Sequence, residues 1–157
     1  MKYAFVHGRL LDGTEDMQPQ EGLAVLTDGE KIVDIMPNKA VPYGYTKVDL
    51  KGKYIMPGLI NMHVHLAGNG KPQKKQRDNE KLVKTIMSTG LTKAVAYKMV
   101  AAFAKLELLS GVTTIRTVGG LAEFHTRIKD EITAGRKDGP RNLAANPGLS
   151  VPGGPMA

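Results

Sequence analysis

Two histidines separated by one residue, His63 and His65, are the side chains of this chain best suited to chemistry. Side chains alternate between the two faces of a β-strand, so both imidazoles are expected on one face. An apolar run precedes the pair, and a polar loop that contains Gly68 follows it. Both rings are therefore expected at the C-terminal end of a strand, where metal-dependent barrel enzymes place their active sites.

The chain contains no Cys, which excludes disulfides, thiolate zinc sites and cysteine nucleophiles. Any metal ion must therefore be held by histidine, carboxylate or modified side chains. His7 lies in a turn-prone strand and is expected at the surface, and His125 is expected on the solvent-facing side of a helix, so neither is predicted to be a ligand. Arg116 and Thr117 end a second strand at the same end of the predicted sheet as the histidine pair, where a structural role is favoured over substrate contact.

The chain has 157 residues with 22 Lys and Arg against 15 Asp and Glu, a net charge of +7. An apolar content of 41% supports a packed core, while 5% aromatic residues and no Trp argue against nucleic-acid stacking. No known nucleic-acid-binding motif accompanies the charge. The N-terminus becomes polar too early for a signal peptide, and no apolar run approaches the roughly 20 residues that cross a bilayer. We therefore expect a soluble cytoplasmic protein with neither a nucleic acid nor a membrane as partner.

Part of the positive charge is local, in one polar stretch that follows the histidine pair. The structural interpretation is a solvated loop and the start of a helix, and the functional interpretation is attraction of acidic groups of a substrate. The basic residues of this stretch are Lys71, Lys74, Lys75, Arg77, Lys81 and Lys84.

The sequence pattern of residues 1–56 predicts a small antiparallel β unit. Asp28-Gly29 is a strong hairpin signal, because both turn positions tolerate positive φ, and Lys51-Gly52-Lys53 is a weaker one. The expected strands are Tyr3–Leu11, Leu23–Leu26, Lys31–Ile35, Val48–Leu50 and Tyr54–Met56.

From Pro57 the pattern changes to strand, helix, strand, helix, strand, which indicates an α/β fold with a parallel sheet and right-handed crossovers. The expected strands are Leu59–His63, Val112–Val118 and Arg141–Asn146. A helix capped by Asp78 carries Leu82, Val83, Ile86 and Met87 and is interrupted at Gly90. A second helix opens near Thr92 with a predicted core face of Val95, Met99, Phe103, Leu106 and Leu109. The last helix places Phe124, Ile128 and Ile132 on one face.

Three segments together resemble the amidohydrolase superfamily, in particular its imidazolonepropionase-like and dipeptidase-like members. They are the run Lys51 to Asn61 after a β-rich start, the pair His63-Val64-His65, and Gly111-Val112-Thr113-Thr114-Ile115-Arg116. The resemblance implies a distorted (β/α)8 TIM-like barrel with a small β-sandwich built from both chain ends. It also implies that His63 and His65 bind one or two divalent metal ions, zinc above all. The implied reaction is hydrolysis of C–N bonds in a small cyclic amide, imide or dipeptide-like substrate.

The resemblance covers only the front of that family. We expect residues 1–56 to be part of the sandwich and residues 57–157 to be the first β/α units, because a complete barrel takes about 250 residues. In the family the remaining ligands and the catalytic aspartate lie on later strands, and Pro155 stands where close relatives are expected to carry a histidine. We therefore predict an N-terminal fragment that is inactive alone, with no catalytic residue of its own and exposed barrel edges that favour self-association. The alternative is a non-catalytic truncated homologue that acts as an assembly partner.

Overall fold

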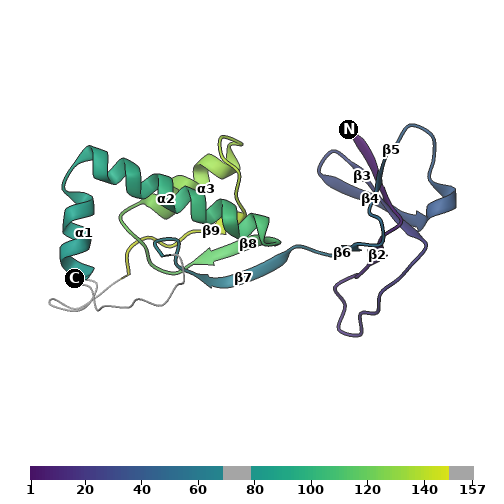
Figure 1. Ribbon diagram of the computed structural model, residues 1–157, viewed down its shortest axis with the longest axis horizontal. Coiled ribbons are helices and arrows are strands. Elements are labelled where there is room, and N and C mark those ends of the chain that lie inside the picture. Colours follow the sequence, from purple (N-terminus) through teal and green to yellow (C-terminus); the bar gives the residue numbers. More distant parts are fainter. Residues whose placement is uncertain (69–78, 149–157) are drawn as a thin grey trace. The chain divides into compact units, whose positions relative to one another are not determined.

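The computed structural model describes residues 1–68 and 79–148 (Figure 1). The chain divides into two compact units, Met1–Pro57 and Gly58–Ala157. Each unit contains its own cluster of buried apolar side chains.

The first unit is built from two small sheets. Four strands pair in the order β4-β3-β1-β5, and a second sheet pairs β2 with β6. Side chains of β1 alternate between buried and partly exposed positions, as expected for a sheet with one covered face, and Ala4 and Val6 pack on Ala24 and Leu26. The strands are β1 (Lys2–Val6), β2 (Arg9–Leu10), β3 (Leu23–Asp28), β4 (Lys31–Pro37), β5 (Thr46–Asp49) and β6 (Tyr54–Ile55), with the short 3-10 helix η1 (Asn38–Ala40) after β4.

The stronger of the two predicted hairpins is confirmed. β3 and β4 pair antiparallel, and Asp28 is paired with Lys31. The two-residue loop is therefore Gly29-Glu30, one residue later than the sequence pattern indicated. Gly29 adopts a φ of 59°, which glycine reaches without steric cost.

The weaker hairpin is wrong, and so is the expectation that the unit is wholly antiparallel. β5 runs parallel to β1, and β6 runs parallel to β2. The Lys51-Gly52 turn does not fold β6 back onto β5, because Gly52 N donates to the carbonyl of His7. The predicted strand Tyr3–Leu11 is also broken at His7, whose φ is 57°. β1 and β5 therefore pair in the first sheet, and the strands that follow them in the chain, β2 and β6, pair in the second sheet.

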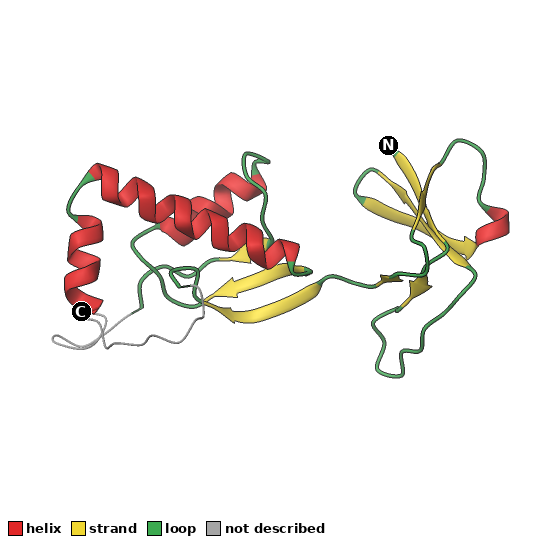
Figure 2. Ribbon diagram, viewed as in Figure 1, coloured by secondary structure: helices red, strands yellow, loops and turns green. Residues whose placement is uncertain are grey.

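The second unit has the predicted order of strands and helices. Its parallel sheet has the order β7-β8-β9, and α2 and α3 lie on one face of it (Figure 2). The strands are β7 (Leu59–Val64), β8 (Val112–Thr117) and β9 (Arg141–Leu143), and the helices are α1 (Asn79–Met87), α2 (Gly90–Leu109) and α3 (Phe124–Thr133). β9 ends three residues earlier than expected. None of the helices in the described ranges is long and apolar enough to cross a membrane.

The predicted core face of α2 is wrong at four of its five positions, and only Phe103 packs, partly buried, against the core of the unit. Val95, Leu106 and Leu109 are 61%, 58% and 70% exposed, and Met99 is exposed as well. The face that packs on the sheet consists instead of Ala96, Tyr97, Val100 and Ala104. Apolar residues at helical spacing occur on two sides of this helix, so spacing alone could not choose between them. The structure buries the side with two alanines, whose small side chains allow the helix to approach the sheet closely.

Candidate metal centre

His63 and His65 lie at the C-terminal end of β7, and both side chains are exposed. Their Nε2 atoms are 3.2 Å apart, and the ring planes meet at 65° with centroids 5.1 Å apart. Val64 between them is buried in the core of the unit. The alternation expected from the sequence therefore brings the two imidazoles together on the face opposite Val64.

The strand is irregular directly before the pair. Asn61 is paired with Ile115, and Val64 is paired with Thr117, so β7 carries one residue more than β8 across this interval. Such β-bulges re-aim side chains and are common beside functional sites. Arg116 Nε donates to the carbonyl of Met62 at 2.9 Å, and the backbone N–H of His63 donates to Asn61 Oδ1 at 3.2 Å. Side chains thus satisfy the backbone groups that lie around the bulge.

The separation of the two Nε2 atoms fits two neighbouring ligands of one zinc ion. Nitrogen ligands lie about 2.0–2.1 Å from zinc, so two corners of a tetrahedral shell are about 3.3–3.4 Å apart. The same 3.2 Å separation also permits a hydrogen bond between the two imidazoles when no metal is bound. In residues 1–68 and 79–148, no third His, Cys, Asp or Glu joins the pair in an arrangement that could hold a metal ion. The described part of the chain therefore holds two imidazole nitrogens at the spacing that two of the four positions of a tetrahedral shell would need.

His125 is buried, contrary to the prediction that it faces solvent. It lies in the first turn of α3, and its exposed fraction is 1%. The ring is 3.0 Å from the carbonyl of Ala145, which can only accept, so Nδ1 donates and Nε2 carries the lone pair. Nε2 has no hydrogen-bond partner in the described structure. Burial lowers the pKa of His125, and the nearby charge of His65 lowers it further.

The loop before α3 explains why this ring is accommodated. A Cβ on Gly120 would overlap the imidazole of His125, so glycine at that position leaves the space that the ring fills. The sequence did carry a signal for this burial, because His125, Ile128 and Ile132 follow the three- and four-residue spacing of one helix face. The Phe124, Ile128 and Ile132 face itself is confirmed, with Ile132 partly buried.

Thr117 and Arg116 make contacts within the fold, as the favoured structural interpretation predicted. Thr117 is fully buried at the end of β8, and its hydroxyl accepts a hydrogen bond from the backbone N–H of Ala145 at 3.2 Å. Asn142 on β9 donates from Nδ2 to the carbonyl of His125 at 3.4 Å. These bonds link the ends of β8 and β9 to the beginning of α3.

The remaining candidate positions contribute little to this centre. His7 is an exposed residue of the first unit with Nδ1 3.3 Å from Asp49 Oδ1, as expected for a surface residue. Of the basic cluster, Lys81 and Lys84 lie exposed on α1, and its members from Lys71 to Arg77 lie outside the described residues. Pro155 lies outside them too.

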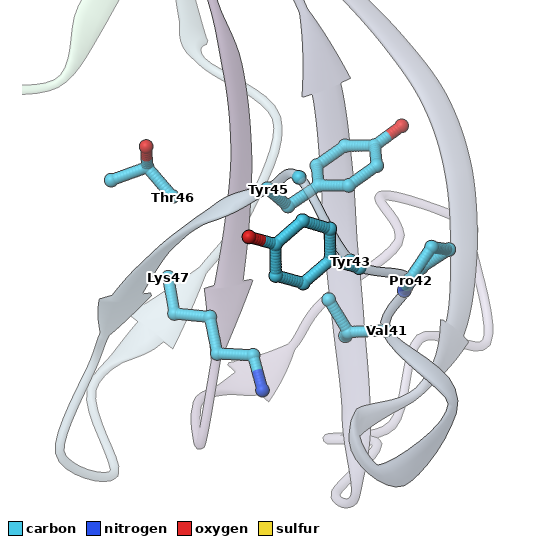
Figure 3. Close-up of a pocket in the computed structure, with 7 residues that line it drawn as sticks. Val41, Pro42, Tyr43, Tyr45, Thr46 and Lys47 are labelled. Carbon is cyan, nitrogen blue, oxygen red and sulfur yellow. The ribbon is translucent and has the colours of Figure 1, made fainter.

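A hollow in the first unit also lacks the side chains for such chemistry. It is lined by seven consecutive residues, 41–47, and Figure 3 shows Tyr43, Tyr45 and Lys47 around it. None of the seven is a histidine or a carboxylate. The hollow therefore offers no second metal-ligating set.

No protein-family model matches the chain. Among curated proteins, the dihydroorotase of Wolbachia sp. subsp. Drosophila simulans (strain wRi) is 35% identical over 75 residues, which cover 47% of this chain and 17% of that protein. A 5-methylthioadenosine/S-adenosylhomocysteine deaminase of Bacillus cereus (strain B4264) is 29% identical over 68 residues, 42% of this chain and 16% of the deaminase. This chain thus matches only a small part of the length of these relatives.

Solved structures match over nearly the whole chain. A Xaa-Pro dipeptidase with bound methionine gives a TM-score of 0.74 at 25% identity, covering 99% of this chain and 36% of the dipeptidase. A prolidase structure from Bifidobacterium longum gives 0.71 at 28% identity, covering 99% and 33%. Sequence and fold therefore lead to one class, since the chain is similar to members of the amidohydrolase superfamily. The similar proteins include prolidases, dihydroorotases and deaminases.

Proposed function

We propose that this chain carries the first pair of metal ligands of an amidohydrolase-type active site. His63 and His65 bind a divalent metal ion, zinc in our proposal, through Nε2. The reaction served is hydrolysis of a C–N bond in a small cyclic amide or dipeptide-like substrate. The observation that carries this proposal is the approach of the two Nε2 atoms to 3.2 Å at the C-terminal end of a parallel strand.

The relatives support the reaction class. They include dihydroorotases and a Xaa-Pro dipeptidase, which act on small-molecule or dipeptide substrates. When bound, a divalent metal polarises the carbonyl and lowers the pKa of bound water toward about 7. The part of this chain is to present two imidazoles that are exposed to solvent, on a strand end that Arg116 holds through its hydrogen bond to the carbonyl of Met62. A (β/α)8 barrel, of which β7, β8 and β9 are the first strands, is part of the same proposal.

Two ligands do not make a catalytic centre. A catalytic zinc site in a protein has three protein ligands and one open position. Because the described residues supply a pair, we expect metal binding by the pair to be weak and hydrolysis to require further ligands and a carboxylate acid/base. We therefore expect no turnover from residues 1–68 and 79–148 by themselves.

A second candidate function is that of a non-catalytic assembly partner. The observation in its favour is the exposed apolar side of α2, where Val95, Leu106 and Leu109 are all more than half exposed. This function does not require metal binding, so zinc binding would support the first candidate and its absence would leave only the second.

The test is a calorimetric titration of the full chain with zinc. We expect weak binding of one zinc ion per chain, and loss of this binding in His63→Ala and in His65→Ala. The matched control is His7→Asn, which removes an exposed histidine of the first unit where asparagine tolerates the positive φ. Equal binding by all four proteins, or no binding by the unaltered chain, would contradict the proposal.

A further inference from the structure

One long side of α2 is apolar and exposed. Its members, called here the α2 stripe, are Leu91, Val95, Met99, Ala102, Leu106 and Leu109. Leu91 is 76% exposed and Leu109 is 70% exposed, so the stripe runs from one end of the helix to the other. In Figure 2, α2 lies on the sheet of its unit with its other side turned away from the strands.

The spacing of the α2 stripe is that of a helix-pairing seam. From Val95 onward the intervals are four, three, four and three residues, the alternation of a and d positions in a heptad repeat. At about 100° per residue, all six members fall within an arc of about 80°. The face that packs on the sheet, with Val100 at its centre, lies on the opposite side of the helix. The stripe is therefore a second apolar face, separate from the one that holds α2 in its fold.

Charge distinguishes the two borders of the α2 stripe. Lys98 and Lys105 are seven residues apart and occupy the same heptad position, directly before Met99 and Leu106. Lys105 Nζ also contacts Asp138 Oδ2 at 2.7 Å. The opposite border, with Thr92, Phe103 and Ser110, carries no charge. Charged residues that flank a heptad seam set the choice and the orientation of the partner helix.

We propose that the α2 stripe docks an amphipathic helix of another protein, with apolar residues at heptad spacing and Glu or Asp facing Lys98 and Lys105. Charge complementarity argues for this occupant over a second copy of the chain. Two copies packed antiparallel along the stripe would bring Lys98 and Lys105 of one against the same lysines of the other, and like charges at such positions repel. The docking goes beyond the proposed metal site and does not depend on it.

The expected affinity is modest. A helix of 20 residues is about 30 Å long, so the contact covers roughly three heptads. Single-helix contacts of this size fall at the small end of protein interfaces, which are weak or transient. We therefore expect binding in the micromolar range, with a marked dependence on salt because the flanking charges are exposed.

The probes are two fluorescein-labelled helical peptides of three heptads with leucine at the a and d positions, one with glutamate and one with lysine at the flanking positions. Fluorescence anisotropy with the full chain should show binding of the glutamate peptide, and the lysine peptide should bind at least about tenfold more weakly. Leu106→Glu and, as a second variant, Val95→Glu should each weaken binding of the glutamate peptide by about tenfold or more. The matched control is Ile32→Glu on β4, where the isoleucine is 66% exposed and the substitution should change nothing.

A charge exchange tests the border directly. Lys98→Glu combined with Lys105→Glu should reverse the preference, so that the lysine peptide binds more tightly than the glutamate peptide. Lys129→Glu, an exposed lysine on α3, should leave the preference as it was. Circular dichroism establishes that each variant has kept its helices.

Four outcomes would overturn the proposal. The first is that both peptides bind equally well, and the second is that Ile32→Glu weakens binding as much as Leu106→Glu does. The third is that sedimentation finds a dimer which Leu106→Glu makes monomeric, so that the occupant is a second copy. The fourth is that the chain binds vesicles containing phosphatidylserine, loses this binding in Leu106→Glu, and has no affinity for the glutamate peptide.

Discussion

The guanidinium of Arg116 donates a hydrogen bond from Nε to the backbone carbonyl of Met62, at 2.9 Å, and so ties β8 to the bulge of β7 directly before His63. This contact crosses from one strand to the next at the place where the regular pairing is interrupted. It positions the strand end that carries both imidazoles, without itself touching a ligand atom.

Replacement of Arg116 by methionine should therefore weaken metal binding more than it weakens the fold. The lost hydrogen bond is expected to cost about 1 kcal/mol of unfolding free energy, because the arginine is exposed. Outer contacts that orient metal ligands are worth about 10–100-fold in metal affinity, and we expect the low end of that range here. Zinc calorimetry and urea unfolding of the same samples test this prediction. An unchanged zinc affinity with a lowered stability would assign Arg116 to the fold alone.

The stability of the chain should decrease as the pH falls below about 6.5, the ordinary pKa of histidine in an unfolded chain. Burial lowers the pKa of His125 in the folded state, so the unfolded state binds a proton at a higher pH than the folded state does. The stability is therefore fully present above pH 6.5 and is lost as the pH falls through the folded pKa. Urea unfolding in the presence of a chelator, from pH 7.5 to pH 5, measures this change.

His125→Phe removes the titrating group and should flatten that pH dependence. His7→Asn, which removes an exposed histidine, should retain it. A pH dependence that is the same in His125→Phe as in the unaltered chain would show that the effect arises elsewhere.

Gly120→Ala should destabilise the chain, because the added Cβ would overlap the imidazole of His125. Displacing a buried ring in a packed site costs about 1–3 kcal/mol. Gly90→Ala is the matched control, since Gly90 begins α2 and a Cβ there meets nothing within 4 Å. In thermal unfolding, the change in melting temperature caused by Gly120→Ala should differ in sign or in size from the change caused by Gly90→Ala. Equal melting temperatures would mean that the Gly120 loop can move away from the ring.

Two valines on α2 test which face of the helix is buried. Val100 is 1% exposed and Val95 is 61% exposed. Val100→Ala should cost about 2 kcal/mol of unfolding free energy through the cavity that it leaves. Val95→Ala should change the unfolding free energy by less than about 0.5 kcal/mol. If Val95→Ala cost more than Val100→Ala, the buried face of α2 would be the one predicted from the sequence pattern.

The sequence allowed some of these features to be predicted and not others, for physical reasons. The strand–helix alternation of the second unit was predictable because β8 is rich in β-branched residues and because glycines lie beside the helix ends. The approach of His63 to His65 followed from the two-residue period of a strand. The packed face of α2 was not predictable, because both sides of that helix are apolar and only contact with the sheet selects one. The burial of His125 depends on space left by Gly120, and the parallel pairing of β5 with β1 depends on bonds between distant segments.

The most direct test of the central claim is the ligation state of the imidazole nitrogens. Long-range ¹H–¹⁵N spectra of the ¹⁵N-labelled full chain, recorded with and without zinc, distinguish Nε2 from Nδ1 in each histidine. We predict that zinc shifts the Nε2 resonances of His63 and His65 together, while those of His7 and His125 stay where they are. Zinc-dependent shifts at His7 or His125, or no shift at the His63–His65 pair, would contradict it.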